Sequence, residues 1–175
     1  MDPIDIEGIF CEIVSNDGRK LVIGAIYRPP GAPLSFLKLL HDYMSVHIAP
    51  SSRMIIGVDF NLSDINWNTL SITGGDVDSA NALLDIAFSF NLEQLVNSST
   101  RFQDGTSSVL DLVFLSNRLI GKQWKCEVVD GLSDHAMVYV IGNHVGSCGR
   151  FPVQKHNDIS RADDVTVLDA LASNF

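Results

Sequence analysis

The chain has 175 residues, about the length of one domain and enough to bury a hydrophobic core. A hydrophobic content of 46% and a charged content of 19% exclude a disordered chain, because disordered chains are polar and highly charged. The formal net charge of −9 argues against a simple basic nucleic-acid-binding module, although it does not exclude a DNA substrate.

The sequence predicts an intracellular protein, cytoplasmic or nuclear, with no contact with a membrane. No window holds the roughly 18 consecutive apolar residues of a membrane span. The stretch Met1–Glu12 carries acids and no Lys or Arg, so it lacks the basic region of a signal peptide. The cysteines Cys11, Cys126 and Cys148 are isolated, which indicates neither a disulfide framework nor a zinc site.

Two β-rich runs, Gly8–Val14 and Leu21–Arg28, predict a hairpin because Asp17-Gly18 lies between them. Pro29-Pro30 ends the second strand, since proline cannot donate to a strand ladder. A helix capped by Ser35 follows and runs to about His47. Its expected apolar face recurs at three- and four-residue steps and comprises Phe36, Leu39, Leu40, Tyr43, Met44 and His47.

A buried strand is expected at Arg53–Phe60, and a polar surface loop at Asn61–Gly75. Asp78 or Ser79 is expected to cap a second helix, and Asp76 is expected to lie at the helix entry rather than to bind a metal. The expected apolar face of this helix comprises Ala80, Leu83, Leu84, Ala87 and Phe88. Further short strands are expected at Asn91–Val96, Val109–Ser116, Cys126–Val129 and Ala136–Ile141. A second Asp-Gly turn, Asp104-Gly105, precedes the second of them.

Two helices among several strands, some of them joined by hairpins, favour an α+β fold. Such a pattern is typical of helices packed on mixed or antiparallel sheets, and not of a strictly parallel doubly wound sheet. From Gly142 onward the chain is rich in glycine and polar residues. The expected division is therefore a domain over residues 1–145 and a linker or tail over residues 146–175.

Polar residues interrupt the apolar strands at places that indicate chemistry. Asp59 and Asn61 follow an apolar run, and strand alternation would place both on one side, where they could hold and deprotonate a water. An Asx-turn that closes the strand explains the same two residues equally well. Asp111 stands inside another apolar run, where a charge is costly unless it is paired. An ion pair with His135 would give this acid a partner and would orient the imidazole and favour its charged form.

Five motifs in order resemble a known family. They are Ile26-Tyr27-Arg28-Pro29-Pro30, Gly57-Val58-Asp59-Phe60-Asn61, Ser99-Thr100-Arg101-Phe102, Ser108-Val109-Leu110-Asp111-Leu112-Val113-Phe114 and Ser133-Asp134-His135. Together they resemble the endonuclease/exonuclease/phosphatase superfamily, related to apurinic endonucleases and DNase I. The Tyr-Arg-Pro-Pro and Thr-Arg-Phe motifs are most similar to the endonuclease domain of non-LTR retrotransposons.

The resemblance implies magnesium-dependent hydrolysis of a phosphodiester in DNA, with Mn²⁺ as a second cation that could serve. Asp59 matches the acid that positions or deprotonates the attacking water, and Asn61 matches the amide beside it. His135 matches the histidine that stabilises the developing charge on the scissile phosphate, and Asp111 the acid that orients this histidine.

The resemblance also implies residues that bind the substrate and the metal. Tyr27 matches a phenol that hydrogen-bonds the phosphate, and Thr100 a hydroxyl that contacts the DNA backbone. Ser133, which supports the turn before His135, is expected among the substrate-binding residues. Asp134 matches an acid near the metal or the phosphate. The implied fold is a four-layer α/β/β/α sandwich of two mostly antiparallel sheets with outer helices.

The family's early asparagine and principal metal-binding glutamate lie upstream of the Tyr-Arg-Pro-Pro strand. Only about two dozen residues precede Tyr27, and neither Glu7 nor Glu12 matches the missing glutamate. The expectation is a C-terminal portion of the domain, with its first part missing and little activity alone, fused in the parent element to a reverse transcriptase. Two alternatives stay open: a non-catalytic relic or gene-model fragment, and a phosphoesterase that acts on another phosphate ester.

Overall fold

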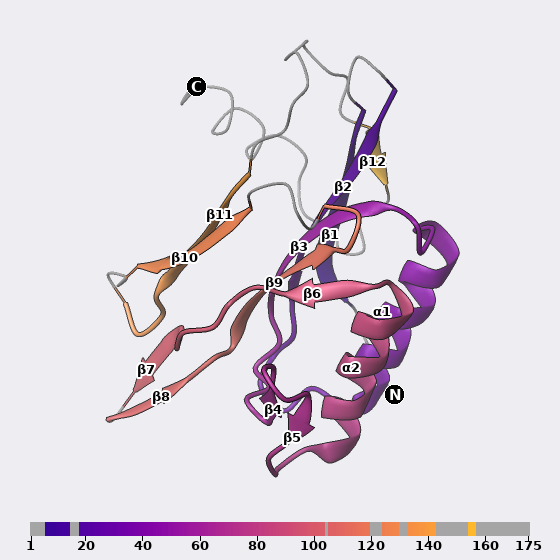
Figure 1. The fold of residues 1–175 in the computed structure, drawn as a ribbon. Coiled ribbons are helices and arrows are strands. Elements are labelled where there is room, and N and C mark those ends of the chain that lie inside the picture. The colour runs from indigo at the N-terminus through magenta and orange to yellow at the C-terminus, as the bar shows by residue number, and fades with distance from the viewer. Residues whose placement is uncertain are drawn as a thin grey trace.

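The computed structural model describes residues 6–14, 18–103, 105–119, 124–129, 133–142 and 154–156 (Figure 1). The expected Asp17-Gly18 and Asp104-Gly105 turns lie partly outside these residues, and the expected tail over 146–175 lies almost wholly outside them. The described elements are β1 (Glu7–Val14), β2 (Lys20–Tyr27), α1 (Leu34–His47), β3 (Arg53–Asp59), β4 (Ile65–Asn66), β5 (Ser71–Ile72), α2 (Val77–Ser89), β6 (Leu92–Gln94), β7 (Arg101–Gln103), β8 (Thr106–Ser108), β9 (Asp111–Ser116), β10 (Lys125–Val129), β11 (Met137–Ile141) and β12 (Gln154–His156).

A six-stranded mixed sheet forms the centre of the described structure, with the strand order β12-β1-β2-β3-β9-β6. The neighbours β2 and β3 are parallel, and the other pairs in this sheet are antiparallel. The connection between the two parallel strands contains α1, as parallel pairing requires a crossover. The expected mixed sheet is therefore confirmed.

The register of this sheet aligns polar residues of four strands in one row. Glu7 pairs with Tyr27, Tyr27 with Asp59, and Asp59 with Asp111. Residues that pair across neighbouring strands project from the same face of a sheet. The row therefore brings residues that are far apart in the sequence to one end and one face of the sheet.

Both helices cover the other face of the main sheet (Figure 1). Alternate residues of the central strands, such as Ile56 and Phe114, form one hydrophobic cluster with the buried side chains of α1 and α2. On the face that carries the polar row, the β10–β11 ribbon lies beside β9, and a smaller cluster packs there around Leu115. This arrangement of outer helices, a large sheet and a small second sheet agrees with the expected α+β sandwich.

Two details of α1 differ from the expectation. The helix begins at Leu34, and its N-cap is Pro33, so Ser35 lies in the first turn and does not cap it. Leu37 is fully buried, whereas Leu39 is 41% exposed. The buried set Phe36, Leu37, Leu40 and Met44 shows that the helix faces the sheet about 100° away from the side on which Leu39 lies.

The entry of α2 and two short hairpins also differ from the expectation. Asp76 caps α2, because its carboxylate accepts a hydrogen bond from the Ser79 N–H at 3.1 Å, and Phe88 is exposed. The expected loop over Asn61–Gly75 contains the β4–β5 hairpin and buries Ile65. β7 and β8 form a second hairpin that projects away from the main sheet (Figure 1). These strands have only two or three residues each, too few to show a period of two.

No helix in the described ranges is long and apolar enough to cross a membrane.

The placement of α1 predicts opposite outcomes for two leucines of the same helix. We expect Leu37→Ala to lower the free energy of unfolding by about 2–5 kcal/mol, because it leaves a cavity in the core. Leu39→Ala should change it by no more than about 0.5 kcal/mol, since this side chain contacts solvent. Urea unfolding followed by circular dichroism measures both, and equal losses in the two variants would contradict the placement.

Candidate active site

One member of the polar row lies where β3 ends. Asp59 is the last residue of this strand, and Asn61 has a φ of 48°, so strand alternation does not extend to Asn61. The Asn61 N–H donates to Asp59 Oδ1 at 3.0 Å, which closes an Asx-turn. The Asn61 side-chain amide donates to the Arg28 carbonyl, also at 3.0 Å. The Asx-turn is therefore present, and it fixes one oxygen of the Asp59 carboxylate.

Arg28 supports this turn from the interior of the protein, where its side chain is only 2% exposed. Its guanidinium donates to the carbonyl of Phe60 at 3.1 Å and to the carbonyl of Ala32. It also lies 3.7 Å from the carboxylate of Asp76, the cap of α2. One buried cation thus ties the end of β2, the end of β3 and the start of α2 together. The sequence interpretation gave Arg28 no role of its own, although a charge at the end of an apolar run was a signal.

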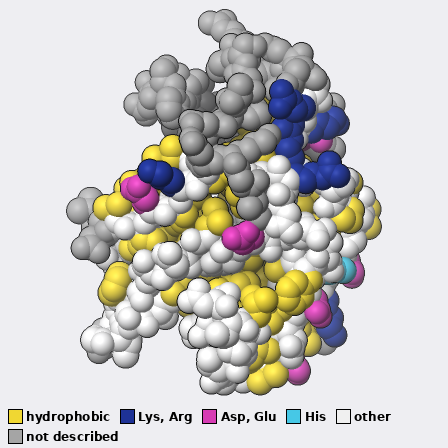
Figure 2. All heavy atoms as spheres, viewed as in Figure 1, with side chains coloured by type: hydrophobic (Ala, Val, Ile, Leu, Met, Phe, Trp, Pro, Cys, Tyr) yellow, Lys and Arg dark blue, Asp and Glu magenta, His cyan; other side chains and the backbone are white. Residues whose placement is uncertain are grey.

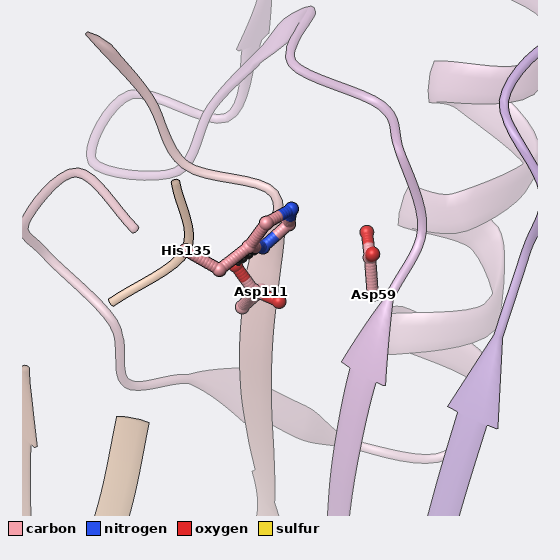
Figure 3. A group of neighbouring side chains, drawn as sticks. All are labelled: Asp59, Asp111 and His135. Carbon is pink, nitrogen blue, oxygen red and sulfur yellow. Dashed lines mark hydrogen bonds and ion pairs between the residues drawn. The ribbon is translucent and has the colours of Figure 1, made fainter. Parts of the chain in front are cut away.

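Asp111 and His135 form the ion pair that the sequence predicts. His135 Nδ1 lies 2.9 Å from Asp111 Oδ2, and each side chain is more than a quarter exposed. Asp111 is the first residue of β9, and His135 lies on the segment that leads to β11. Figure 3 shows the imidazole above the Asp111 carboxylate, on the side that faces Asp59. The acid orients the ring, because it occupies one of its two nitrogens.

Asp59 lies next to this pair, and its pairing with Asp111 explains the proximity. Each of the three residues offers one ligand atom, and these atoms lie within 4.8 Å of one another. Two of the three are carboxylates, and Mg²⁺ prefers oxygen ligands. Since His135 Nδ1 already contacts Asp111, the two carboxylates are the groups that fit a cation such as Mg²⁺ or Mn²⁺.

Burial raises the pKa of the Asp59 carboxyl above its ordinary value, and the nearby charge of Asp111 adds to the increase. The Asn61 N–H opposes this effect most, and the positive groups of His135 and Arg101 oppose it less. A carboxylate whose ionised form is disfavoured in this way takes up a proton more readily than a solvated one. This property suits a group that accepts a proton from water.

Known proteins match both the sequence and the fold. The family model described as endonuclease-reverse transcriptase matches residues 21–139. The chain belongs to this family. The family lies within the endonuclease/exonuclease/phosphatase superfamily, which confirms the resemblance found in the motifs. No curated protein sequence matches the chain.

Solved structures share the fold at low sequence identity. The endonuclease domain of TRAS1, a telomere-specific non-LTR retrotransposon, matches with a TM-score of 0.60 and 18% identity, over 77% of this chain and 61% of that one. The AP endonuclease of Archaeoglobus fulgidus matches with a TM-score of 0.56 and 12% identity, over 80% of both chains. The AP endonuclease LMAP of Leishmania major matches with a TM-score of 0.59 and 12% identity, over 77% of this chain and 54% of that one.

Three other expected site residues of this endonuclease-reverse transcriptase family member lie in the row or near it. Tyr27 stands beside Asp59 and is 40% exposed. The Ser133 hydroxyl accepts a hydrogen bond from the His135 N–H at 3.2 Å, so it shapes the turn that carries the histidine. The Asp134 carboxylate lies 3.3 Å from the Arg101 guanidinium and is not among the clustered ligand atoms. The role near the metal or the phosphate that the resemblance implies for Asp134 stays a prediction.

Thr100 has no exposed surface, so the implied contact of its hydroxyl with DNA does not fit the structure. Its hydroxyl oxygen accepts hydrogen bonds from the N–H groups of Leu110 and Asp111. Thr100 therefore belongs to the framework beneath the site.

A hollow of about 570 Å³ opens beside the site on the face of the main sheet that the helices do not cover. Asp59, Asp111 and Tyr27 line it, and so does Glu7, which stands at the outer end of the polar row. The sequence did not assign Glu7 a role, because its place in the row follows only from the pairing of β1 with β2. Figure 2 shows hydrophobic side chains at several places on the viewed surface, including the side of the β10–β11 ribbon. The hollow combines apolar walls with a charged end.

The raised pKa of Asp59 predicts a change in stability with pH. Because the folded state disfavours the ionised carboxylate, the chain loses stability as pH rises through the interval between the unfolded and folded pKa values, and the loss persists at neutral pH. Asp59→Asn removes the charge and keeps an oxygen for the Asn61 N–H. We therefore expect D59N to be more stable than the wild type at pH 7 and the difference to shrink on acidification.

Urea unfolding at a series of pH values, with a chelator present, measures this difference. Asp85→Asn on the exposed side of α2 is the matched control, since it removes one negative charge from a solvated position. A D59N variant that is less stable than the wild type at pH 7 would contradict the assigned environment of Asp59.

Proposed function

We propose that the chain is the DNA endonuclease domain of a retrotransposon-type protein and hydrolyses a phosphodiester with Mg²⁺. The observation that carries the proposal is the contact of 2.9 Å between His135 and Asp111, with Asp59 beside it in the same cluster. Membership in the endonuclease-reverse transcriptase family supports DNA as the substrate and a reverse transcriptase as the fused partner. The fold shared with the TRAS1 endonuclease domain supports the same proposal.

The residues of the site divide the work of in-line hydrolysis. Asp59 accepts a proton from the attacking water, and the Asn61 N–H holds the carboxylate in place through Oδ1. His135 faces the phosphate with Nε2, the ring nitrogen that Asp111 does not contact, and offsets the charge that develops there. Tyr27 presents its phenol to the hollow, where it can donate a hydrogen bond to a phosphate oxygen.

A divalent cation would be held by Asp59 and Asp111. Bound there, it supplies positive charge that offsets the repulsion between the carboxylates and the phosphate. Mn²⁺ accepts the same carboxylate ligands, so it should replace Mg²⁺. Only two carboxylates contribute to the cluster in the described residues, and Mg²⁺ commonly takes its remaining ligands from water and substrate phosphate.

Nicking of supercoiled plasmid tests the proposal in the complete reading frame that contains this sequence. We expect His135→Ala to lower kcat/KM by about 10²–10³-fold, because the developing charge loses its partner. Asp111→Asn should lower it by about 10–100-fold, since the ring loses the group that orients it. His41→Ala, on α1 behind the sheet, is the matched control and should leave the rate unchanged. Equal rates for H135A and the wild type would refute the proposal.

The 175-residue chain alone should nick plasmid at least about tenfold more slowly than that longer polypeptide. The chain spans 61% of the length of the TRAS1 endonuclease domain, and Ile9, which lines the hollow, is 41% exposed. The measurement compares both proteins at equal concentration with Mg²⁺ and with a chelator. A magnesium-dependent rate in the short chain that equals the longer one and disappears in H135A would contradict this expectation.

A further inference from the structure

Thr100 is buried in the framework of the site, where it cannot contact a substrate. It lies directly before β7, between the segment that carries Asp111 and the segment that carries His135, and its exposed fraction is zero. Buried polar groups in folded proteins are almost always hydrogen-bonded, so the partners of its hydroxyl define its role.

The Thr100 hydroxyl binds the segment of Asp111. The N–H groups of Leu110 and of Asp111 both donate to Thr100 Oγ1, each at 3.0 Å. A hydroxyl oxygen has two lone pairs, so these two bonds use its full capacity as an acceptor. The first residue of β9 is therefore held through the side chain of the residue that precedes β7.

The Thr100 backbone binds both segments. Its N–H donates to the Ser108 carbonyl at 2.8 Å, and its carbonyl accepts from the Ala136 N–H at 2.6 Å. The isolated bridge between Arg101 and His135 continues this pairing by one residue. Thr100 is thus bonded directly to Asp111 and to the residue that follows His135.

We propose that Thr100 is a positioning residue that sets the contact between Asp111 and His135. This inference rests on the proposed function for its effect on catalysis, whereas the geometry of the pair can be measured without activity. Because the hydroxyl fixes the Asp111 backbone and the carbonyl fixes the neighbour of His135, loss of the hydroxyl frees one half of the pair while the other stays in place. The distance of 2.9 Å between His135 Nδ1 and Asp111 Oδ2 then depends on a residue whose hydrogen bonds go to the backbone of the two segments.

The activity test compares substitutions at Thr100 in the complete reading frame. Thr100→Val keeps the shape and removes the acceptor, and we expect kcat to fall by about 100-fold with KM unchanged, since a displacement of about 1 Å has such an effect. Thr100→Ser restores the acceptor and should keep kcat within about threefold of the wild type. A valine variant with the kcat of the wild type, or a serine variant as impaired as the valine variant, would overturn the proposal.

A spectroscopic test separates this proposal from the function. In the 175-residue chain at fixed pH, NMR follows the His135 Nδ1–H resonance and the exchange of the Leu110 and Asp111 amide protons. T100V should shift the resonance and accelerate both amides, and T100S should preserve them. Thr106→Val, which removes an exposed hydroxyl from β8, is the matched control and should change none of these signals.

The outcomes remain distinguishable. An inactive wild type with the expected NMR response would refute the proposed function and leave Thr100 as the residue that positions the pair. An active wild type whose Nδ1–H resonance is unchanged in T100V would refute the role of Thr100 alone. If T100V does not fold, Thr100→Ala removes the same acceptor with less volume, and the same two criteria apply to it.

Discussion

The site depends on the relative register of β2, β3 and β9. Tyr27, Asp59 and Asp111 are paired across these strands, and their side chains project from the face that the helices leave free. A shift of β9 by one residue would turn Asp111 toward the hydrophobic core and Leu112 toward the hollow. The core enforces the register, because Val58 and Leu112, which are also paired, are buried under the helices. Apolar packing on one face of the sheet thus fixes the positions of the polar side chains on the other face.

Strand pairing places the site residues side by side, but it does not extend beyond the ends of the strands. Hydrogen bonds from side chains fix the backbone there. Arg28 donates hydrogen bonds to carbonyls beyond β2 and β3, and the Thr100 hydroxyl accepts hydrogen bonds from the N–H groups at the start of β9. Both residues are buried polar groups whose partners come from segments distant in sequence. Without these bonds, the backbone groups at the strand ends would exchange hydrogen bonds with water, and the residues of the candidate site would be less fixed. The framework beneath the site is therefore polar, while the framework of the sheet is apolar.

The sequence predicted the longer strands and the positions of the polar residues that interrupt them, because both follow from local rules. An aspartate inside an apolar strand requires a partner, and a histidine directly before another strand offers one, so the Asp111–His135 pair explained both residues. The exposed side of α1 was not predictable in the same way, since Leu37 and Leu39 fit the helical period about equally and the sheet decides between them. Thr100 and Glu7 also depend on partners from other strands. Buried acceptors and cross-strand rows leave no periodic signal.

The negative charge of the chain has a direct effect at Asp59. Burial and Asp111 both disfavour the ionised carboxylate, and the guanidinium of Arg101, which opposes this effect, already contacts Asp134. The site is thus short of positive charge when it is alone. A cation placed between the two carboxylates would reverse this imbalance, because positive charge favours their ionised forms. Binding of the cation and of the phosphate would then be coupled, because the cation neutralises the carboxylate charge that opposes the phosphate.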